Sequence, residues 1–267
     1  MRTLQRNNIV DVFVWVDDHL PKHPKPGTKP TLRDSGVVTI LLWDGLTEPH
    51  STLKEIYAWI QRDYNDCFPR LPTYQNFVAH VHRLLPVLVW LLEQTLSTAS
   101  PLRFVDSTML PVCRRVRADR HRVVKNIAAW GKNHQGWWYG FKLHAAIDYK
   151  NKLAALHFTP ANESDVLQLR HLVDQTTRIV VGDAGYTAKV TRRHLWRDYR
   201  CAVISPPRPK QTWTMSAFEQ FLLTLRQKIE ATFGRLKTKH KLVTSFPRSI
   251  KGYFVHYIRT LLGYQVG

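Results

Sequence analysis

Cysteine is scarce in this sequence, and its scarcity excludes two kinds of scaffold. Only 3 cysteines occur among 267 residues, Cys67, Cys113 and Cys201, and no two of them form a C-x-x-C pair. Widely spaced cysteines in odd number support neither a disulfide framework nor a zinc knuckle, and they favour a reducing cytosol. None of the 13 histidines has the spacing of a zinc site either.

Long hydrophobic runs are also missing. No stretch reaches the roughly 20 apolar residues that a membrane-spanning helix needs. The first apolar run, residues 10–16, is short, contains Asp11 and is followed by two more acids, so it does not resemble a signal peptide. We therefore expect a cytoplasmic protein with no membrane partner.

Acidic residues are scarce in the second part of the chain only. Residues 1–100 hold 10 basic and 10 acidic residues, whereas residues 101–267 hold 29 basic and 10 acidic residues, the source of the whole net charge of +19. Such an excess favours a polyanionic partner, and nucleic acid is the commonest one. A ribosome-associated protein, or a merely basic one, is the alternative that charge alone leaves open.

The first part of the chain predicts an all-helical module, residues 1–98. After a short leading helix and a proline- and lysine-rich segment at residues 21–30, helical periodicity covers residues 36–46, 51–64 and 74–95. The segment 97–101 is the predicted hinge.

The second part, residues 99–267, changes pattern. Strands are predicted at residues 102–107, 141–147, 153–159, 178–182 and 201–204, and helices at 164–176, 187–197, 218–237 and 251–264. Three early strands followed by alternating helices and strands predict an α/β fold, a mixed sheet flanked by helices on both faces.

Three acids stand at positions that suit a site for phosphate chemistry. Asp106 and Asp183 each close an apolar strand pattern, and Glu230 lies within the predicted helix 218–237. Sites in α/β sheets form beyond strand ends, and adjacent carboxylates repel unless a cation lies between them. Oxygen ligands favour Mg²⁺ or Mn²⁺ over zinc. Taken singly, each Asp is more often a turn residue or a helix cap.

Glu230 shares one stripe of its helix with Arg226 and Lys237, opposite the apolar side. One interpretation places Glu230 on the metal and the two basic residues on flanking DNA phosphates. The alternative is a solvated face with an ordinary Arg226–Glu230 pair.

A basic segment follows Asp106, and we expect it to border the site. Its six basic residues are candidate DNA contacts, and Lys142 on the predicted strand 141–147 is a further one; the segment's members are Arg114, Arg115, Arg117, Arg120, Arg122 and Lys125. Phosphate contacts of this kind make binding salt-dependent. A solvated basic face is the alternative.

As an ordered set, these motifs resemble the DDE transposases of bacterial insertion sequences. The resemblance covers most of residues 68–264 and rests on Asp106-Ser107-Thr108, the segments at 139–144 and 159–165, Gly182-Asp183-Ala184-Gly185-Tyr186, and the R-x3-E-x6-K spacing of Arg226, Glu230 and Lys237. It departs from the pattern at Leu223, where many relatives carry Tyr.

The resemblance implies a ribonuclease H-like fold for the sheet domain. It implies that Asp106, Asp183 and Glu230 are catalytic and hold Mg²⁺ or Mn²⁺, in two ions, for cleavage of DNA and joining of the 3′-hydroxyl to a target. The implied partners are double-stranded DNA, both element terminal repeats and target, and a second copy of the chain, in the bacterial nucleoid. The helical module would recognise element ends or mediate multimerisation. A ribonuclease H-like nuclease without strand transfer, and an inactive element-derived DNA-binding protein, are the alternatives.

Overall fold

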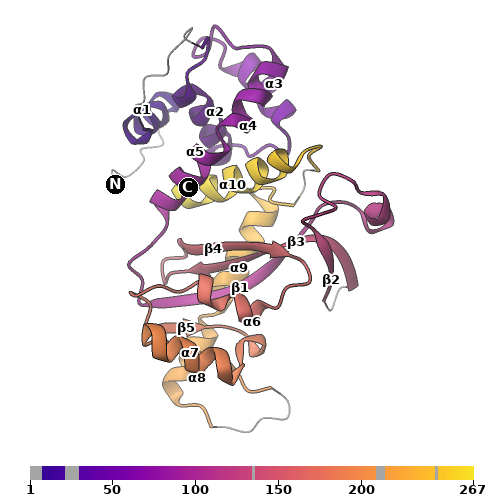
Figure 1. Ribbon diagram of the computed structural model, residues 1–267. Coiled ribbons are helices and arrows are strands. Elements are labelled where there is room, and N and C mark those ends of the chain that lie inside the picture. Colours follow the sequence, from indigo (N-terminus) through magenta and orange to yellow (C-terminus); the bar gives the residue numbers. More distant parts are fainter. Residues whose placement is uncertain (1–7, 22–29, 134–135, 209–213, 244–245) are drawn as a thin grey trace. The chain divides into compact units, whose positions relative to one another are not determined.

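The computed structural model describes residues 8–21, 30–133, 136–208, 214–243 and 246–267. Most of the predicted proline- and lysine-rich segment, residues 22–29, lies outside the described residues. The chain divides into two compact units (Figure 1). Met1–Thr95 together with Leu236–Gly267 form the first, which we call the helical unit, and Leu96–Arg235 form the second, the sheet unit.

The helical unit contains six described helices that lie wholly within it. They are α1 (Ile9–His19), α2 (Asp34–Leu46), α3 (Leu53–Asp63), α4 (Tyr74–Arg83), α5 (Leu85–Thr95) and α10 (Ile250–Val266). Helix α10 packs against α2 and α5, and Figure 1 shows it in yellow among the purple helices. Because α2 and α10 are buried on nearly all sides, they form the centre of this unit.

The C-terminal segment is the main difference from the predicted domain division. The first boundary lies close to the predicted hinge, but residues 236–267 join the N-terminal helices instead of the sheet. The approach of α10 to α2 explains why: Cβ atoms built at Gly45 or Gly263 would come within 3.0 Å of the other glycine's Cα. Two glycines let these backbones touch, a pairing of distant residues that periodicity does not reveal.

An enclosed ion pair joins the same two helices. The Arg259 guanidinium on α10 donates from Nη1 to Oδ2 of Asp44 on α2 at 2.8 Å, and both side chains are buried. The other Asp44 oxygen accepts from the backbone N–H of His50 at 3.0 Å and lies 2.7 Å from His50 Nδ1. The carboxylate is therefore fully used by protein donors.

The long helix predicted at residues 74–95 is wrong, since two helices replace it. Helix α4 ends at Arg83 and α5 begins at Leu85. Pro86 has no N–H to donate to the carbonyl of His82, and its ring would clash there inside a continuous helix. At the start of α5 the same proline is tolerated.

The sheet unit is built on one mixed sheet. Its strands are β1 (Leu102–Pro111), β2 (Ala129–Asn133), β3 (Gly136–Ile147), β4 (Leu153–Pro160), β5 (Ile179–Val181) and β6 (Ala202–Ile204). The order is β2-β3-β1-β5-β6, with β4 also paired to β3. The pairs β1–β3, β2–β3 and β3–β4 are antiparallel, and β1–β5 and β5–β6 are parallel. This arrangement confirms the ribonuclease H-like α/β fold; β2 was not predicted.

The helices of the sheet unit are α6 (Asp165–Gln168), α7 (Lys189–Tyr199), α8 (Ala217–Thr224) and the first part of α9 (Gln227–Thr238), with short 3₁₀ turns at Arg115–Arg120, Leu169–His171 and Ala184–Tyr186. Two of the three helices predicted for the sheet unit are interrupted or shortened, whereas α7 has the predicted length and begins two residues later. The predicted helix 164–176 ends at Gln168, and near its expected end Asp174 accepts hydrogen bonds from Thr176 and pairs with the buried Arg103. These bonds hold the chain in a turn.

The helix predicted at residues 218–237 is also two helices. Thr224 donates its hydroxyl to the Phe221 carbonyl at 2.7 Å, and the chain turns at Leu225 and Arg226 before α9 begins. Phe218 and Phe221 were expected on the buried side but are 58% and 57% exposed. The break therefore rotates the start of α9 relative to α8 and places Arg226 at the joint.

No helix among the described residues has the length and apolar character to cross a bilayer.

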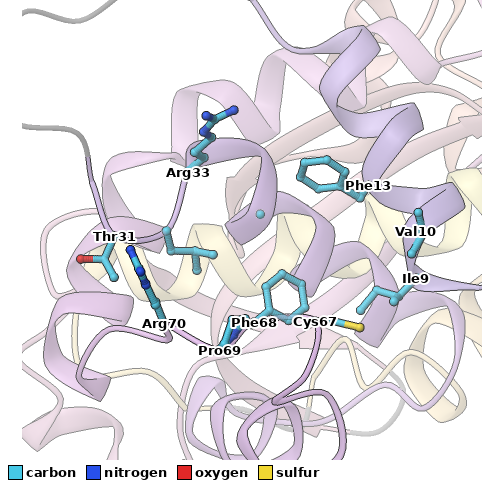
Figure 2. A pocket seen from close by; sticks show the side chains of 11 residues that line it. Ile9, Val10, Phe13, Thr31, Arg33, Cys67, Phe68, Pro69 and Arg70 are labelled. Carbon is cyan, nitrogen blue, oxygen red and sulfur yellow. The ribbon is translucent and has the colours of Figure 1, made fainter.

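The helical unit has a cavity of about 410 Å³ beside α1 and α2 (Figure 2), lined mainly by apolar side chains such as Phe13 and Phe68. None of its described lining residues is acidic, so this cavity is not the predicted carboxylate site.

Candidate active site

Asp106 lies in the middle of β1, so the prediction that it ends a strand is wrong. The parallel partner β5, however, pairs only with Leu102, Arg103 and Phe104. Asp106 is two residues beyond the last of these pairs, and Asp183 is two residues beyond Val181, the end of β5. Both acids thus lie past the same carboxyl end of the parallel strands, where sites form in such sheets.

The backbone after β5 explains the glycines around Asp183. Asp183 Oδ1 accepts a hydrogen bond from the Gly185 N–H at 2.8 Å, and a Cβ at Gly185 would stand 2.8 Å from that oxygen. A Cβ at Gly182 would stand 2.6 Å from the Tyr186 ring. The two glycines therefore let the chain fold back tightly and hold the carboxylate in one orientation.

The electrostatics of Asp106 show that acids converge on it. Burial, together with the nearby carboxylates of Asp183 and Asp165, raises the pKa of Asp106 to about 6, against the opposing effects of the Ser107 N–H and Arg226. The Ser107 N–H donates to Asp106 Oδ1 at 2.8 Å. A half-buried carboxyl beside two other acids is a poor place for negative charge unless a cation joins it.

Tyr186 adds an unusual polar atom to this cluster. The side chain is buried, and its hydroxyl has no hydrogen-bond partner among the described residues. Burial, followed by the charges of Asp165, Asp106 and Asp183, raises the pKa of Tyr186 well above its ordinary value. An unpaired buried hydroxyl is costly and needs an explanation such as a bound water or ion.

Glu230 is linked to the other acids through Arg226. Arg226 Nη2 donates to Glu230 Oε1 at 2.5 Å, and Arg226 Nη1 lies 3.9 Å from Asp106 Oδ2. The ordinary Arg226–Glu230 pair that the alternative interpretation expects is therefore present, but Arg226 also faces Asp106. Among the described residues, no group of three His, Cys, Asp or Glu side chains is gathered closely enough to hold a metal ion.

Asp165 is the acid that the sequence patterns did not select as a site residue. Its Oδ2 accepts from the Ser107 hydroxyl at 2.9 Å, and its Oδ1 accepts from Lys142 Nζ at 2.8 Å. Lys142 also donates to the Glu163 carbonyl at 2.7 Å. The lysine expected on DNA is therefore engaged inside the unit, where it holds Asp165. The segment 159–165 in the family resemblance was the one available signal for Asp165.

His144 has the structural role expected of a buried histidine. Its Nε2 lies 2.8 Å from the Thr159 hydroxyl and its Nδ1 lies 3.8 Å from Asp165. Burial lowers the pKa of His144 to about 4, so the ring is neutral at pH 7. It supports the strands under Asp165 and brings no charge to the acids.

The basic segment is exposed, and its place beside the acids stays a prediction. All six of its basic residues are solvent-exposed. Strand β1 continues five residues past Asp106 before the segment begins, about 17 Å at the usual rise of a strand. Lys237 lies on α9 two residues past the end of the sheet unit; its contact with DNA stays a prediction.

Two of the three predicted metal ligands, Asp106 and Asp183, have oxygen atoms that suit a hard divalent cation. Asp106 and Asp183 present carboxylate oxygens to one acidic region that also contains the unpaired Tyr186 hydroxyl. Oxygen ligands suit Mg²⁺ or Mn²⁺. Glu230 is occupied by Arg226 in this structure.

Comparison with known families agrees with this arrangement. Residues 96–250, more than half of the chain, match the family model described as "Transposase DDE domain". The matched region contains Asp106, Asp165, Asp183 and Glu230. No curated protein sequence matches the chain.

Proposed function

The chain belongs to the DDE transposase family, and on that premise we propose that it binds the ends of a bacterial insertion sequence, cleaves the DNA there and joins the freed 3′-hydroxyl to target DNA. Members of this family generally use divalent metal ions. The observation that carries the proposal is the meeting of Asp106 and Asp183 past the parallel strands, where burial and its acidic neighbours raise the pKa of Asp106 to about 6.

In this proposal Asp106, Asp183 and Glu230 are the catalytic acids and would hold Mg²⁺ or Mn²⁺, in two ions. When bound, the ions supply activation of the attacking oxygen and stabilisation of the leaving oxygen in an in-line displacement. The Gly185 N–H and the Ser107 N–H orient the first two carboxylates. No covalent intermediate with a side chain is needed.

Arg226 has two roles open to it at this site. In the structure it neutralises Asp106 and Glu230 together. When Glu230 becomes a ligand, opening of its pair with Arg226 would free the guanidinium for a DNA phosphate. We propose this exchange, since a guanidinium binds phosphate as well as carboxylate.

Asp165 and Lys142 are proposed as positioning residues. Asp165 fixes the Ser107 hydroxyl, and the backbone of Ser107 fixes Asp106. Lys142 holds Asp165 in turn, so its charge stabilises the acidic cluster from inside the unit. This role replaces the direct DNA contact expected for Lys142.

The remaining contacts with DNA are proposed from charge. The exposed basic residues between Arg114 and Lys125, with Lys237 on α9, would track the backbone of element or target DNA. The helical unit would contribute to recognition of the ends, and two copies would pair two ends. The site of action would be the bacterial nucleoid.

A strand-transfer assay tests the proposal. Purified protein is mixed with a pre-cleaved element end that carries a free 3′-hydroxyl and with supercoiled plasmid, in Mg²⁺ or Mn²⁺. Joined products that disappear in Asp183→Asn are expected. Cleavage without joining would indicate a nuclease of the same fold, and DNA binding with neither reaction would indicate an inactive element-derived protein.

A further inference from the structure

The helical unit has a net positive charge that its N-terminal sequence does not supply. Residues 1–95 hold equal numbers of basic and acidic residues, whereas residues 236–267 hold six basic residues and no acidic ones. Because the structure assigns both segments to one unit, that unit carries a formal charge of +6. Its charge therefore comes entirely from the C-terminal segment.

Part of this charge lines a cleft of about 570 Å³ within the helical unit. The start of α3, one side of α4, and the chain that leads into α10 supply its walls. Lys54 and Arg248 line it from two different segments, and both are solvent-exposed. In the described part of the chain neither has an acidic partner, and none of the described lining residues is acidic.

The start of two helices lies at the same cleft. Thr52 and Ser249 are the N-caps of α3 and α10, and both line it. The N-terminus of α10 carries a partial positive charge and backbone N–H groups that suit phosphate oxygens, whereas the N-terminus of α3 is already capped by the Glu55 carboxylate. The helix α10 has 17 residues and is buried over most of its length, so its N-terminus is held firmly.

The floor of the cleft contains a buried polar side chain. Arg259 lines the cleft, is 3% exposed, pairs with Asp44 through Nη1 and has an Nε without a hydrogen-bond partner. His82 lines another wall, where burial and then the positive charge of Lys251 lower the pKa of His82. A Cβ at Gly252 would stand 2.9 Å from Pro247, so this wall is closely packed.

From these observations we propose that the cleft formed by α3, α4 and the start of α10 binds the phosphate backbone of double-stranded DNA through Lys54 and Arg248. The inference rests on the proposed function, because the partner is the DNA that a transposase binds. It adds a contact surface in the helical unit, separate in sequence from the basic segment of the sheet unit. Phe246, 51% exposed beside Arg248, also lines the cleft and offers an apolar contact to a sugar.

Salt dependence of binding tests this inference. Binding of a fluorescent duplex with the element's terminal sequence is measured by anisotropy over a range of salt, with full-length Asp183→Asn protein so that the DNA stays intact. The double variant Lys54→Ala/Arg248→Ala should bind more weakly, and its log–log salt slope should fall by about 2, near 0.9 per lost phosphate contact. An unrelated duplex of the same length should show the same fall, since phosphates carry no sequence.

Arg62→Ala is the matched control, since Arg62 is exposed on α3 like Lys54 but pairs with Asp63. Its slope should equal that of the parent protein, and all variants should have the same Tm. A double variant whose slope matches the control overturns the inference, as does tighter binding of duplex RNA than of DNA. If the double variant loses slope while the protein with its native Asp183 yields no joined products in the strand-transfer assay, the transposase proposal is rejected and the cleft's role in DNA binding stands.

Discussion

The two units each contain an arginine paired with an aspartate, and the two pairs differ in how completely they are enclosed. In the helical unit, Asp44 and Arg259 are both buried and every oxygen of Asp44 has a protein donor. In the sheet unit, Asp106 and Arg226 are about a quarter exposed at 23% and 25%, and 3.9 Å separates their closest atoms. The first pair leaves no carboxylate oxygen without a donor, whereas the second leaves acceptor capacity unused.

This difference separates a structural ion pair from a functional one. Burial opposes charge on both partners of the first pair, since it raises the pKa of Asp44 and lowers the pKa of Arg259, while their mutual attraction acts against these shifts. Removal of one partner would strand a buried charge. Around the second pair, Asp165, Asp183 and the unpaired Tyr186 hydroxyl provide further oxygen atoms, and the guanidinium is shared between two carboxylates. This arrangement suits another cation.

The arginine of each pair can be replaced by methionine, and the largest loss of stability is expected for the pair of Arg259 with Asp44. Arg259→Met should destabilise the protein by about 3–5 kcal/mol, because Asp44 is left uncompensated. Arg226→Met should change stability by no more than about 1 kcal/mol, the range of exposed pairs. Urea unfolding followed by circular dichroism measures both; equal effects would contradict the distinction between the pairs.

The hydrogen bond between Asp165 and Ser107, the residue that orients Asp106, should increase the affinity for metal ions. Asp165→Asn and Ser107→Ala should each weaken Mn²⁺ affinity by about 10- to 100-fold, the usual effect of residues behind a metal ligand. Ser107→Thr, which keeps a hydroxyl, is the matched control and should restore most of the affinity. Calorimetric titration with Mn²⁺ provides the measurement. Equal losses in Ser107→Thr and Ser107→Ala would argue against a role for the hydroxyl.

Asp106→Asn should stabilise the metal-free protein while it removes activity. The pKa of Asp106 is raised to about 6 from an ordinary value near 4, so ionisation of this group destabilises the folded state. The gain from Asp106→Asn should therefore be absent below about pH 4, appear as pH rises, and level off above about pH 6. Thermal melts in EDTA follow it, with Asp119→Asn, an exposed acid of the basic segment, as control. A gain that is the same at every pH would contradict the assignment.

The smallest effects belong to single residues of the basic segment. Arg117→Ala and Arg120→Ala should each lower the log–log salt slope of DNA binding by about 0.9 and leave Mn²⁺ affinity unchanged. A solvated basic face would leave the slope as it is in the parent protein, which an anisotropy series at several salt concentrations resolves.

Local patterns predicted the strands of the sheet other than β2, because short apolar runs are local features. The strand that carries Asp106 and the strand that precedes Asp183 were predicted from such runs, although β1 extends to Pro111 by pairing with β3. The convergence of Asp165 on Ser107 was not predictable, since it depends on contacts across 58 positions of sequence. The same holds for α10, whose glycine contact with α2 draws the C-terminal segment into the helical unit.

The pairing of Glu230 illustrates how a sequence pattern can be correct and incomplete. Helical spacing predicts an Arg226–Glu230 pair, and the structure contains it. The break between α8 and α9 places Arg226 within reach of Asp106 as well. Periodicity along one continuous helix contains no information about that break.

A crystal structure of the DNA complex with Mn²⁺ shows whether Asp106, Asp183 and Glu230 share bound divalent ions. We expect anomalous peaks in contact with Asp106 and Asp183, with Glu230 released from Arg226 to join them. Peaks elsewhere in the protein, or full Mn²⁺ binding by Asp183→Asn, would contradict this expectation.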